Sequence, residues 1–376
     1  MPRWETRVWQ PTLDHRPRQY RAFVPDSIAE FDRSPTLASQ ERCEAASRAL
    51  AGLEQRLPVA WEPIARLLLR AEGLASSQIE GLQVTLRRLL EVQLDPAAPD
   101  AAARWVLANV EAVEQALRES GEPLSLERLL AWHARLMAPS GLPPRYIGRL
   151  RTEPGWIGGT TPLDAAFVPP PAEYLAGLLE DLIRFANRGD LPAVAQAAIV
   201  HAQFETIHPF GDGNGRVGRA LIGWTLRRRG VIDRAVPPIS PVLALERGAY
   251  LAGLHAFQEG RLDAWVGWFA GVAIAAAGRI DDMVARAEGL VQAWEERLGS
   301  MRADAAARRL LRHLPGTPVL DVAKASELVG ASERAIRTAL GVLAEKRILT
   351  VSHRAAQGPG RPRQLWIAPE VLRVFD

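Results

Sequence analysis

The residue types best suited to chemistry lie in one short stretch, His208-Pro-Phe-Gly-Asp-Gly-Asn-Gly-Arg-Val-Gly-Arg219. Glycines at 211, 213 and 215 precede a helical pattern, so the main chain can approach an anion closely there. A glycine loop that leads into a helix N-terminus offers unpaired N–H groups and the positive end of the helix dipole. These features predict a phosphate-binding site.

Four side chains of this stretch supply the other parts of a transfer site. His208 has the side chain best suited to removing a hydroxyl proton near neutral pH. Asp212 provides a carboxylate for a magnesium ion that bridges phosphates. Arg216 and Arg219 are three residues apart, on one face of the following helix, where both can bind phosphate oxygens. Together they indicate phosphoryl or nucleotidyl transfer.

Two other phosphate motifs are excluded. Residues 213–218 match the pattern G-x-G-x-x-G, but the dinucleotide-binding fingerprint must follow a buried strand. Here an alanine-rich helical pattern, Ala193–Ile207, comes first. A Walker-type loop is excluded because Gly-Lys-Ser/Thr occurs nowhere in the sequence. His133 is expected to be a packed helix histidine.

The stretch closely resembles the Fic family signature, HPFx(D/E)GNGRxxR, with no departure at a fixed position. The resemblance extends over roughly residues 35–275, including Tyr146-Ile-Gly-Arg-Leu-Arg151 and Val168-Pro-Pro-Pro171. It implies transfer of AMP from ATP to a Ser, Thr or Tyr hydroxyl of a target protein, with release of pyrophosphate. His208 would deprotonate the hydroxyl, and Asp212 would hold Mg²⁺.

The resemblance also implies the nucleotide and target contacts. Arg216 and Arg219 would orient the β- and γ-phosphates, and the phosphates would be cradled by Gly213, Asn214 and Gly215. Tyr250 and Gln258 stand where relatives line the adenosine pocket, although Asn is more usual at the second position. A hairpin flap would pair with the target like an added strand, and its candidate residues are Ile157, Gly158 and Gly159.

A second, shorter match concerns regulation. Ser76-Ser-Gln-Ile-Glu-Gly81 resembles the inhibitory motif (S/T)xxxE(G/N) of the family, with Ser76 and Glu80 one helical turn apart. The resemblance implies that Glu80 pairs with Arg219 and blocks the productive pose of the γ-phosphate. An ion pair at Arg219 competes with phosphate for the same guanidinium. Removal of AMP, or transfer of another phosphate-linked group such as UMP or phosphocholine, stays open.

Helical periodicity surrounds these motifs. We expect helices at 101–119, 126–137 (with Ser125 as N-cap), 172–187, 193–207, 214–229 and 262–298, and an extended lead-in over 1–35. The expected fold is therefore mainly α: a Fic-type helical core with a small β-hairpin flap. The predicted units are an N-terminal helical region (1–110) with the inhibitory motif, the catalytic core (111–298) and a C-terminal domain (299–376).

The C-terminal domain has its own pattern. Helices at 320–329 and 332–345, then strands at 348–352 and 364–367, predict a winged helix-turn-helix domain. Residues 301–376 carry 13 basic and 7 acidic residues, whereas the first 300 carry 33 and 36. A rival function is therefore DNA binding by a regulator, with contacts from Arg334, Arg337, Arg354, Arg361 and Arg363.

Composition limits the remaining classes. The chain has 376 residues, 48% hydrophobic and 24% charged, which is ordinary for a globular protein. Cys43 alone cannot form an internal disulfide, and the longest apolar run, 265–278, is shorter than the roughly 18 residues of a membrane span. We expect a cytoplasmic protein without membrane contact. Its expected partners are ATP and a protein target, with self-modification and a homodimer left open.

Overall fold

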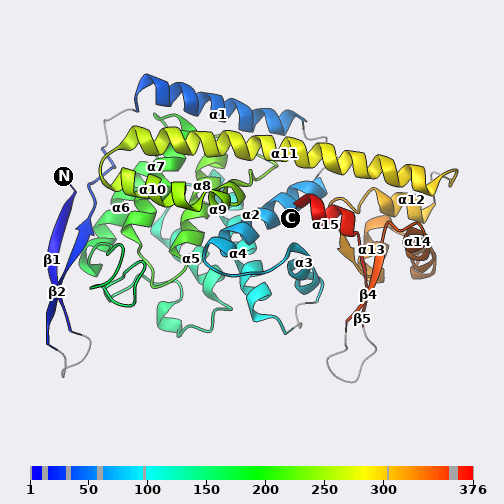
Figure 1. Cartoon of the computed structure of the whole chain (residues 1–376), viewed down its shortest axis with the longest axis horizontal. Coiled ribbons are helices and arrows are strands. Elements are labelled where there is room, and N and C mark those ends of the chain that lie inside the picture. The colour runs from blue at the N-terminus through cyan, green and yellow to red at the C-terminus, as the bar shows by residue number, and fades with distance from the viewer. Residues whose placement is uncertain are drawn as a thin grey trace.

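The computed structural model describes residues 2–10, 16–30, 35–56, 62–95, 99–302, 305–354 and 363–375. Its first three quarters are mainly helical (Figure 1). The helices are α1 (Leu37–Arg56), α2 (Glu62–Ile79), α3 (Leu86–Leu94), α4 (Ala101–Arg118), α5 (Leu126–Met137), α6 (Leu175–Ala186), α7 (Ala193–Ile207), α8 (Asn214–Arg228), α9 (Ile239–Leu245), α10 (Arg247–Gln258) and α11 (Leu262–Leu298). Short 3₁₀ turns lie at Glu119–Gly121, Pro144–Tyr146 and Ala172–Tyr174.

Local chemistry sets several helix ends. The Ser125 hydroxyl accepts a hydrogen bond from the Arg128 N–H at 3.3 Å, which caps α5 at its predicted start. Gly230 has φ 67°, the left-handed conformation that glycine adopts without strain after a helix. The predicted helices 126–137, 193–207 and 262–298 are confirmed at both ends.

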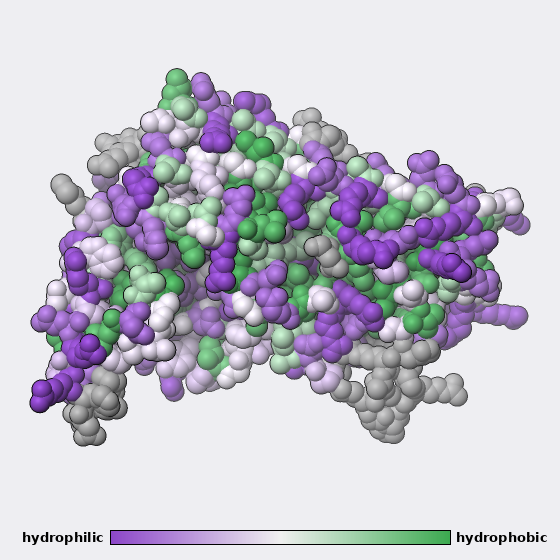
Figure 2. All heavy atoms as spheres, viewed as in Figure 1, coloured by the Kyte–Doolittle hydropathy of each residue, from purple (hydrophilic) through white to green (hydrophobic). Residues whose placement is uncertain are grey.

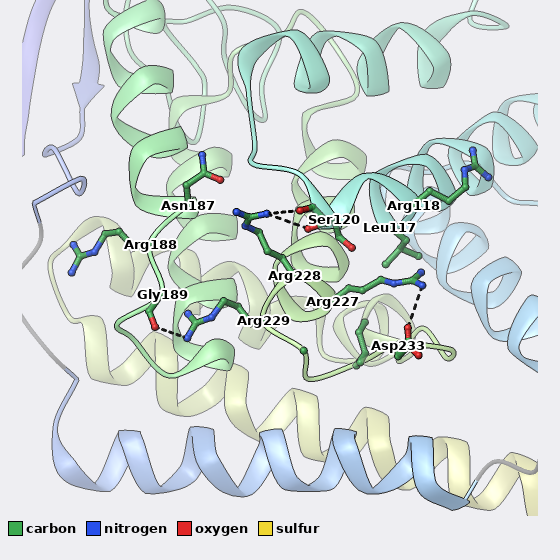
Figure 3. A pocket seen from close by; sticks show the side chains of 13 residues that line it. Leu117, Arg118, Ser120, Asn187, Arg188, Gly189, Arg227, Arg228, Arg229 and Asp233 are labelled. Carbon is green, nitrogen blue, oxygen red and sulfur yellow. Dashed lines mark hydrogen bonds and ion pairs between the residues drawn. The ribbon is translucent and has the colours of Figure 1, made fainter.

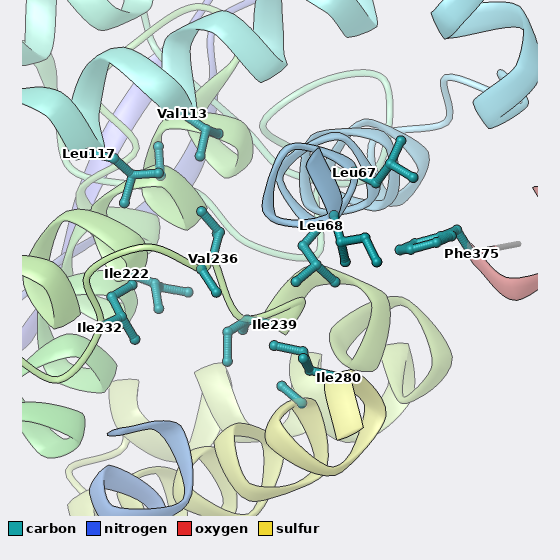
Figure 4. Close-up of a cluster of buried hydrophobic side chains, with 14 of the residues drawn as sticks. Leu67, Leu68, Val113, Leu117, Ile222, Ile232, Val236, Ile239, Ile280 and Phe375 are labelled. Carbon is teal, nitrogen blue, oxygen red and sulfur yellow. The ribbon is translucent and has the colours of Figure 1, made fainter. Parts of the chain in front are cut away.

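The core forms around α7. Nearly every side chain of α7 is buried, because α1, α6, α8, α10 and α11 all pack against it. Helices α1 and α11 lie side by side along the top of Figure 1. The buried hydrophobic cluster in Figure 4 continues to the end of the chain, where the ring of Phe375 points toward Leu68 of α2. One connected core therefore includes side chains of α2, which carries Ser76, of α7 and α8 on either side of residues 208–213, and of α15 (Pro369–Phe375) at the C-terminus.

The N-terminal segment differs from the expected extended lead-in. β1 (Arg3–Trp9) and β2 (Arg18–Val24) form an antiparallel hairpin, in which Arg3 pairs with Val24 and Trp9 with Arg18. The apolar residues of β1 do not mark its packed face, because Trp4 and Val8 are exposed whereas Glu5 and Arg7 are partly buried. The Phe23 N–H donates to the Val168 carbonyl at 2.9 Å, so β2 lies against the segment 168–171, which follows the predicted flap residues in the chain.

The C-terminal part contains two further helices, α13 (Val322–Val329) and α14 (Glu333–Glu345), with α12 (Ala306–Leu311) before them and α15 (Pro369–Phe375) at the end. Ser332 caps α14: the Ala335 N–H donates to its hydroxyl at 3.4 Å. Strands β3 (Val319–Leu320), β4 (Thr350–Arg354) and β5 (Arg363–Ile367) form an antiparallel sheet in the order β3-β5-β4.

The structure differs in several details from the predicted C-terminal domain. Leu320, expected to begin a helix, lies in strand β3, and α13 begins at Val322. Strand β4 begins two residues later than expected, because the Ile348 N–H still donates to Leu343 at the end of α14. Residue 361, a predicted DNA contact, and the side chains of residues 354 and 363 lie outside the described part of the structure. Arg334 and Arg337 are exposed on α14.

The C-terminal part is attached to α11 and α3. Glu370 at the start of α15 accepts from the Trp294 indole N–H at 2.6 Å and pairs with Arg297 at 2.9 Å, both on α11. Arg87 of α3 donates to the Ser352 hydroxyl at 3.1 Å. Figure 2 shows hydrophilic and hydrophobic residues mixed over this face. Among the described helices, none combines the length and apolarity that crossing a membrane requires.

Candidate active site

The signature loop, residues 208–213, joins the buried ends of α7 and α8. Two left-handed residues shape it: His208 with φ 49° directly after α7, and Gly213 with φ 80° directly before α8. The Asn214 side chain holds the loop closed, because its Oδ1 accepts from the Phe210 N–H at 2.8 Å and its Nδ2 donates to the Phe210 carbonyl at 2.9 Å. The amide of Asn214 is therefore engaged with the loop itself.

His133 supports the loop from below. Its ring stacks on Phe210 with 3.8 Å between centroids. Its Nδ1 accepts from the Gly148 N–H at 2.9 Å, so the proton is on Nε2, which lies 3.0 Å from the Asp212 carbonyl. Burial lowers the pKa of His133 to about 4, so the ring is neutral. His133 is thus a packed helix histidine, as expected, and its contacts fix the position of the signature loop relative to α5.

Seven of the fourteen predicted site residues line one cavity of about 180 Å³. It is lined by residues from α2, α7, α8, α10 and the flap, among them Glu80, Ile157, His208, Gly215, Arg219, Tyr250 and Gln258. A second cavity, of about 430 Å³, lies on the other side of His208 and contains Arg151, Trp156 and Asp212. His208 lines both cavities and so can face a nucleotide and an incoming side chain together.

The imidazole of His208 is held in its neutral form. Its side chain is 21% exposed, and Nδ1 lies 4.0 Å from a carboxylate oxygen of Glu205. Burial, followed by the positive charge of Arg151, lowers the pKa of His208 to about 4. The ring is therefore neutral at physiological pH and can accept a proton.

Arg219 is held by the inhibitory-motif helix. Its Nη2 lies 2.8 Å from Glu80 Oε1, and its Nε donates to the Ser76 hydroxyl at 2.9 Å. The Arg219 side chain is 1% exposed, whereas that of Glu80 is 36% exposed. Burial opposes the ionisation of Glu80, but Arg219 outweighs it and keeps the pKa of Glu80 below its ordinary value. The predicted pairing of Glu80 with Arg219 is present, and Ser76 binds the same guanidinium in addition.

Arg216 does not join Arg219 on an open face of α8, as its spacing had suggested. Its guanidinium is buried and lies 4.6 Å from the ring centroid of Trp105 on α4. One nitrogen, Nη2, is 3.2 Å from Asp212 Oδ1. Nε and Nη1 are buried without a hydrogen-bond partner among the described residues. The two arginines thus have different neighbours: Arg219 binds residues at the end of α2, and Arg216 packs against Trp105 of α4.

Tyr250 and Gln258 do reach the cavity. The Tyr250 hydroxyl lies 2.9 Å from His201 Nε2, and its ring packs near Trp265 and Trp268. Gln258 Nε2 donates to the Thr206 hydroxyl at 3.4 Å. Both side chains line the cavity that contains His208 and Arg219, which Asp212 does not line. Their contact with adenosine stays a prediction.

The flap is the segment 152–170. Ile157 and Phe167 exchange both main-chain hydrogen bonds, at 2.8 and 3.1 Å, across an isolated antiparallel bridge. Gly158 and Gly159 follow with φ 67° and 79°. A Cβ at Gly159 would lie 2.6 Å from the Asp164 carbonyl, so glycine is required for the turn. The expected hairpin is therefore a single bridge with a tight turn.

Asp212 is the candidate metal ligand. Its side chain is 47% exposed at the mouth of the loop, and its Oδ1 accepts from the Gly213 N–H at 2.5 Å. No cluster of three or more metal-ligating side chains occurs in the described ranges. A lone exposed carboxylate beside a phosphate site fits Mg²⁺, which takes one or two carboxylates and completes its shell with water and phosphate oxygens.

A larger cavity, of about 710 Å³, lies at the other end of α8 (Figure 3). It contains five arginines: Arg118, Arg188, Arg227, Arg228 and Arg229. Arg227 pairs with Asp233 at 3.4 Å, and Arg228 and Arg229 donate to main-chain carbonyls across the cavity. The guanidiniums thus bind the protein itself, and none of the predicted site residues lines this cavity.

Sequence reasoning missed two side chains that shape the site, Arg151 and Trp105. Arg151 ends a stretch that was noted only for its resemblance, and nothing in its spacing indicates what it contacts. Trp105 belongs to an amphipathic helix and looks like any other core aromatic residue. Their partners, His208 and Arg216, lie 57 and 111 residues away in the chain, so only the fold brings them together.

Comparisons with known proteins agree with this geometry. The family model "Fic/DOC family" matches residues 123–226, and "Fic/DOC family N-terminal" matches residues 40–118. Protein adenylyltransferase fic-1 of Caenorhabditis elegans is 29% identical over 175 residues, 46% of this chain and 30% of that protein. A probable protein adenylyltransferase of Aquifex aeolicus is 28% identical over 198 residues, 52% of this chain and 57% of that one.

The chain thus spans less than two thirds of these curated relatives. Among solved structures, a Fic family protein from Desulfovibrio desulfuricans G20 superposes with a TM-score of 0.56 at 22% identity, covering 89% of this chain and 98% of that one. Fic-1 from C. elegans, residues 134–508, superposes with a TM-score of 0.51 at 21% identity, covering 64% and 71%. These two solved structures therefore have the same fold as this chain.

Proposed function

Because the chain belongs to the Fic/DOC family, we propose that it is a protein adenylyltransferase. It would transfer AMP from ATP to a Ser, Thr or Tyr hydroxyl of a target protein. The observation that carries the proposal is the cavity in which His208, Gly215 and Arg219 meet at the N-terminus of α8. A base, a helix N-terminus and a guanidinium are what an attack on a phosphate requires.

The bonds and protons of the proposed transfer are accounted for by ATP, the target hydroxyl and the side chains of this site. The target hydroxyl oxygen forms a bond to the α-phosphorus, the bond from that phosphorus to the bridging oxygen breaks, and pyrophosphate leaves. The hydroxyl proton goes to the neutral imidazole of His208. The main-chain N–H groups at Gly213–Gly215 and the guanidinium of Arg219 bind the phosphates and align the leaving group.

Mg²⁺ would be held by Asp212. When bound, the ion neutralises charge on the phosphates. Asp212 also lies 3.2 Å from Arg216, so the same carboxylate would connect the metal to that buried guanidinium. Tyr250 and Gln258 would border the adenosine, and the main chain at Ile157 would dock the target by strand addition.

The resting protein would be inhibited by its own helix α2. Glu80 occupies Arg219 at 2.8 Å, and Ser76 occupies the Nε of the same guanidinium. A γ-phosphate that requires Arg219 must displace this carboxylate first. Removal of Glu80 should therefore increase transfer, and a target, a ligand or a partner that moves α2 would act as the trigger.

The test is transfer of label from α-labelled ATP to protein, with Mg²⁺ and cell lysate as a source of targets. Wild type, Glu80→Gly, His208→Ala and the double variant are compared. Strong labelling by Glu80→Gly that vanishes in the double variant supports both the chemistry and the inhibition. Equal labelling by wild type and Glu80→Gly contradicts the inhibition. No labelling by any variant contradicts adenylyl transfer, and a panel of competing nucleotides and phosphocholine donors then decides between other phosphate-linked groups.

A second candidate function belongs to the C-terminal part. We infer a winged helix there from the order α12, β3, α13, α14, β4, β5 with a three-stranded sheet. Arg334 and Arg337 are exposed on α14. DNA binding there would recruit the enzyme or regulate it. A duplex affinity that falls steeply with salt supports this function, and no binding at low salt contradicts it.

A further inference from the structure

The geometry points to Arg151 as a positioning residue that joins the catalytic base and both ends of the flap into one unit. This inference rests on the proposed function, because it assigns to Arg151 the alignment of His208 with a docked target. Arg151 lies on the segment that leads from α5 to the flap and is 6% exposed.

All the hydrogen bonds that Arg151 donates end on main-chain carbonyls. Its Nε donates to His208 O at 2.9 Å, its Nη1 to Glu153 O at 3.1 Å and its Nη2 to Pro170 O at 2.6 Å. Its own main-chain N–H donates to Pro209 O at 2.9 Å. Burial lowers the pKa of Arg151 to about 10, so the guanidinium stays charged at neutral pH.

One side of this arrangement caps α7. The last carbonyls of a helix have no partner within the helix, and a cation there is favoured by the helix dipole. Nε and Nη2 of Arg151 lie 2.9 Å from His208 O and 3.5 Å from Ile207 O. His208 has φ 49°, a conformation that costs free energy in a residue other than glycine. The hydrogen bond from Arg151 stabilises that conformation at the catalytic residue itself.

The other side closes the flap. Glu153 and Pro170 lie at the two ends of the segment 152–170, and a single guanidinium binds both of their carbonyls. Gly155 packs onto the same group: a Cβ there would lie 3.1 Å from Arg151 Nε and 3.2 Å from Pro169 Cγ. The position of the Ile157–Phe167 bridge relative to His208 is thereby fixed.

Lysine cannot replace this group. Arginine presents a planar fork of donors that reaches three carbonyls in different directions, whereas lysine presents one compact ammonium. Arg151→Lys should therefore keep the charge but lose the connection between His208 and the flap. The matched control is Arg149→Gln, because Arg149 lies two residues away and its side chain is exposed.

The experiment compares Arg151→Gln, Arg151→Lys and Arg149→Gln, all in the Glu80→Gly background. We expect kcat for label transfer to fall about 100-fold in Arg151→Gln, the loss typical of a misplaced reacting group. KM for ATP should change little, because Arg151 does not contact the N-terminus of α8. Arg151→Lys should be intermediate, and Arg149→Gln should match the background. A kcat for Arg151→Gln equal to that of Arg149→Gln would overturn the inference.

A second measurement does not need activity or the Glu80→Gly background. Hydrogen exchange of residues 152–170, followed by mass spectrometry, reports on the Ile157–Phe167 bridge. Faster exchange in Arg151→Lys at an unchanged melting temperature supports the inference, and exchange equal to that of Arg149→Gln contradicts it. If Glu80→Gly transfers no label at all, the proposed function fails, whereas the exchange measurement still decides whether Arg151 holds the flap.

Discussion

The carboxylate of Glu80 lies directly against Gly215: a Cβ built at Gly215 would come within 2.0 Å of Glu80 Oε1 and 2.8 Å of Arg219 Nη1. Gly215 belongs to the first turn of α8, where unpaired N–H groups favour an anion. A side-chain carboxylate thus occupies the place where we propose that phosphate binds. In this proposal the contact between Glu80 and Arg219 and the phosphate cradle share the same space.

Gly215→Ala should show whether the Glu80 carboxylate and the phosphates of ATP occupy the same space at Gly215. Alanine is a better helix former than glycine by about 1 kcal/mol, so α8 should still form. The added methyl group forces Glu80 off Arg219, yet it also fills the cradle. We expect a variant that binds ATP at least about tenfold more weakly than Glu80→Gly and shows no gain in transfer. Binding of a fluorescent ATP analogue, measured with both variants, checks this. Affinity equal to that of Glu80→Gly would contradict the shared space.

Ser76→Ala should release the inhibition in part. It removes the hydroxyl that accepts from Arg219 Nε at 2.9 Å, while the Ser76 carbonyl and Glu80 still bind Nη2 at 2.8 Å. A hydrogen bond to a charged group is worth about 1.5–3 kcal/mol. Label transfer should therefore rise above wild type but stay below that of Glu80→Gly.

Ser77→Ala is the matched control for this prediction. Ser77 neighbours Ser76 on α2, but its hydroxyl donates to Gly73 O at 2.9 Å and accepts from Asn109 at 3.0 Å. Its loss should lower the melting temperature and leave transfer at the wild-type level. If both serine variants raise transfer equally, loosening of α2 rather than the contact with Arg219 is responsible.

The sequence was sufficient for contacts within one motif. His208, Asp212, Gly213 and Asn214 are consecutive or nearly so, and a helix–loop–helix path leaves them few alternative arrangements. The pairing of Glu80 with Arg219 was predicted from the resemblance of residues 76–81 to the family's inhibitory motif. The spacing of Ser76 and Glu80 alone indicates a shared helix face but not its partner.

Contacts between distant segments were not predictable in this way. Arg216 turned to Trp105 because α4 happens to cross α8 at that level, and no spacing in the sequence encodes the crossing. Helix periodicity reports which face is buried, but not which neighbour covers it. The N-terminal hairpin was missed for a different reason: in β1 the apolar Trp4 and Val8 are exposed while Glu5 and Arg7 are partly buried, so the apolar positions do not mark the packed face.

The buried Glu72 on α2 should give the protein a distinctive pH dependence. Burial raises its pKa to about 7, although it accepts hydrogen bonds from the N–H of Ser240 at 2.8 Å and from the Ser240 hydroxyl. Between about pH 4.5 and 7 the folded chain keeps this proton while the unfolded chain has lost it. The folded state then binds more protons, so the contribution of Glu72 to the free energy of unfolding falls as the pH rises through this window.

Glu72→Gln removes that titration and should keep two hydrogen bonds to Ser240. We expect the melting temperature of the variant, relative to wild type, to be higher at pH 8 than at pH 5 by the order of 5 °C. Glu205, whose pKa is also raised by burial, is present in both proteins and does not affect the comparison. Thermal unfolding of both proteins from pH 5 to 8 tests the prediction, and parallel curves would contradict it.

Trp105 should matter for nucleotide affinity although it lies outside the cavity that contains His208. Its ring supports the Arg216 guanidinium at 4.6 Å, and Arg216 in turn contacts Asp212, the candidate Mg²⁺ ligand. Trp105→Ala leaves the guanidinium without this face, so Arg216 can turn away from Asp212. In the Glu80→Gly background we expect KM for Mg²⁺–ATP to rise about threefold to tenfold, in line with a cation–π contact that is partly desolvated.

Trp105→Phe is the matched control, because it keeps an aromatic face and should leave KM close to the background value. Steady-state transfer kinetics well below the melting temperature of each variant provide the measurement, and a KM for Trp105→Ala equal to that for Trp105→Phe would show that the ring does not support Arg216.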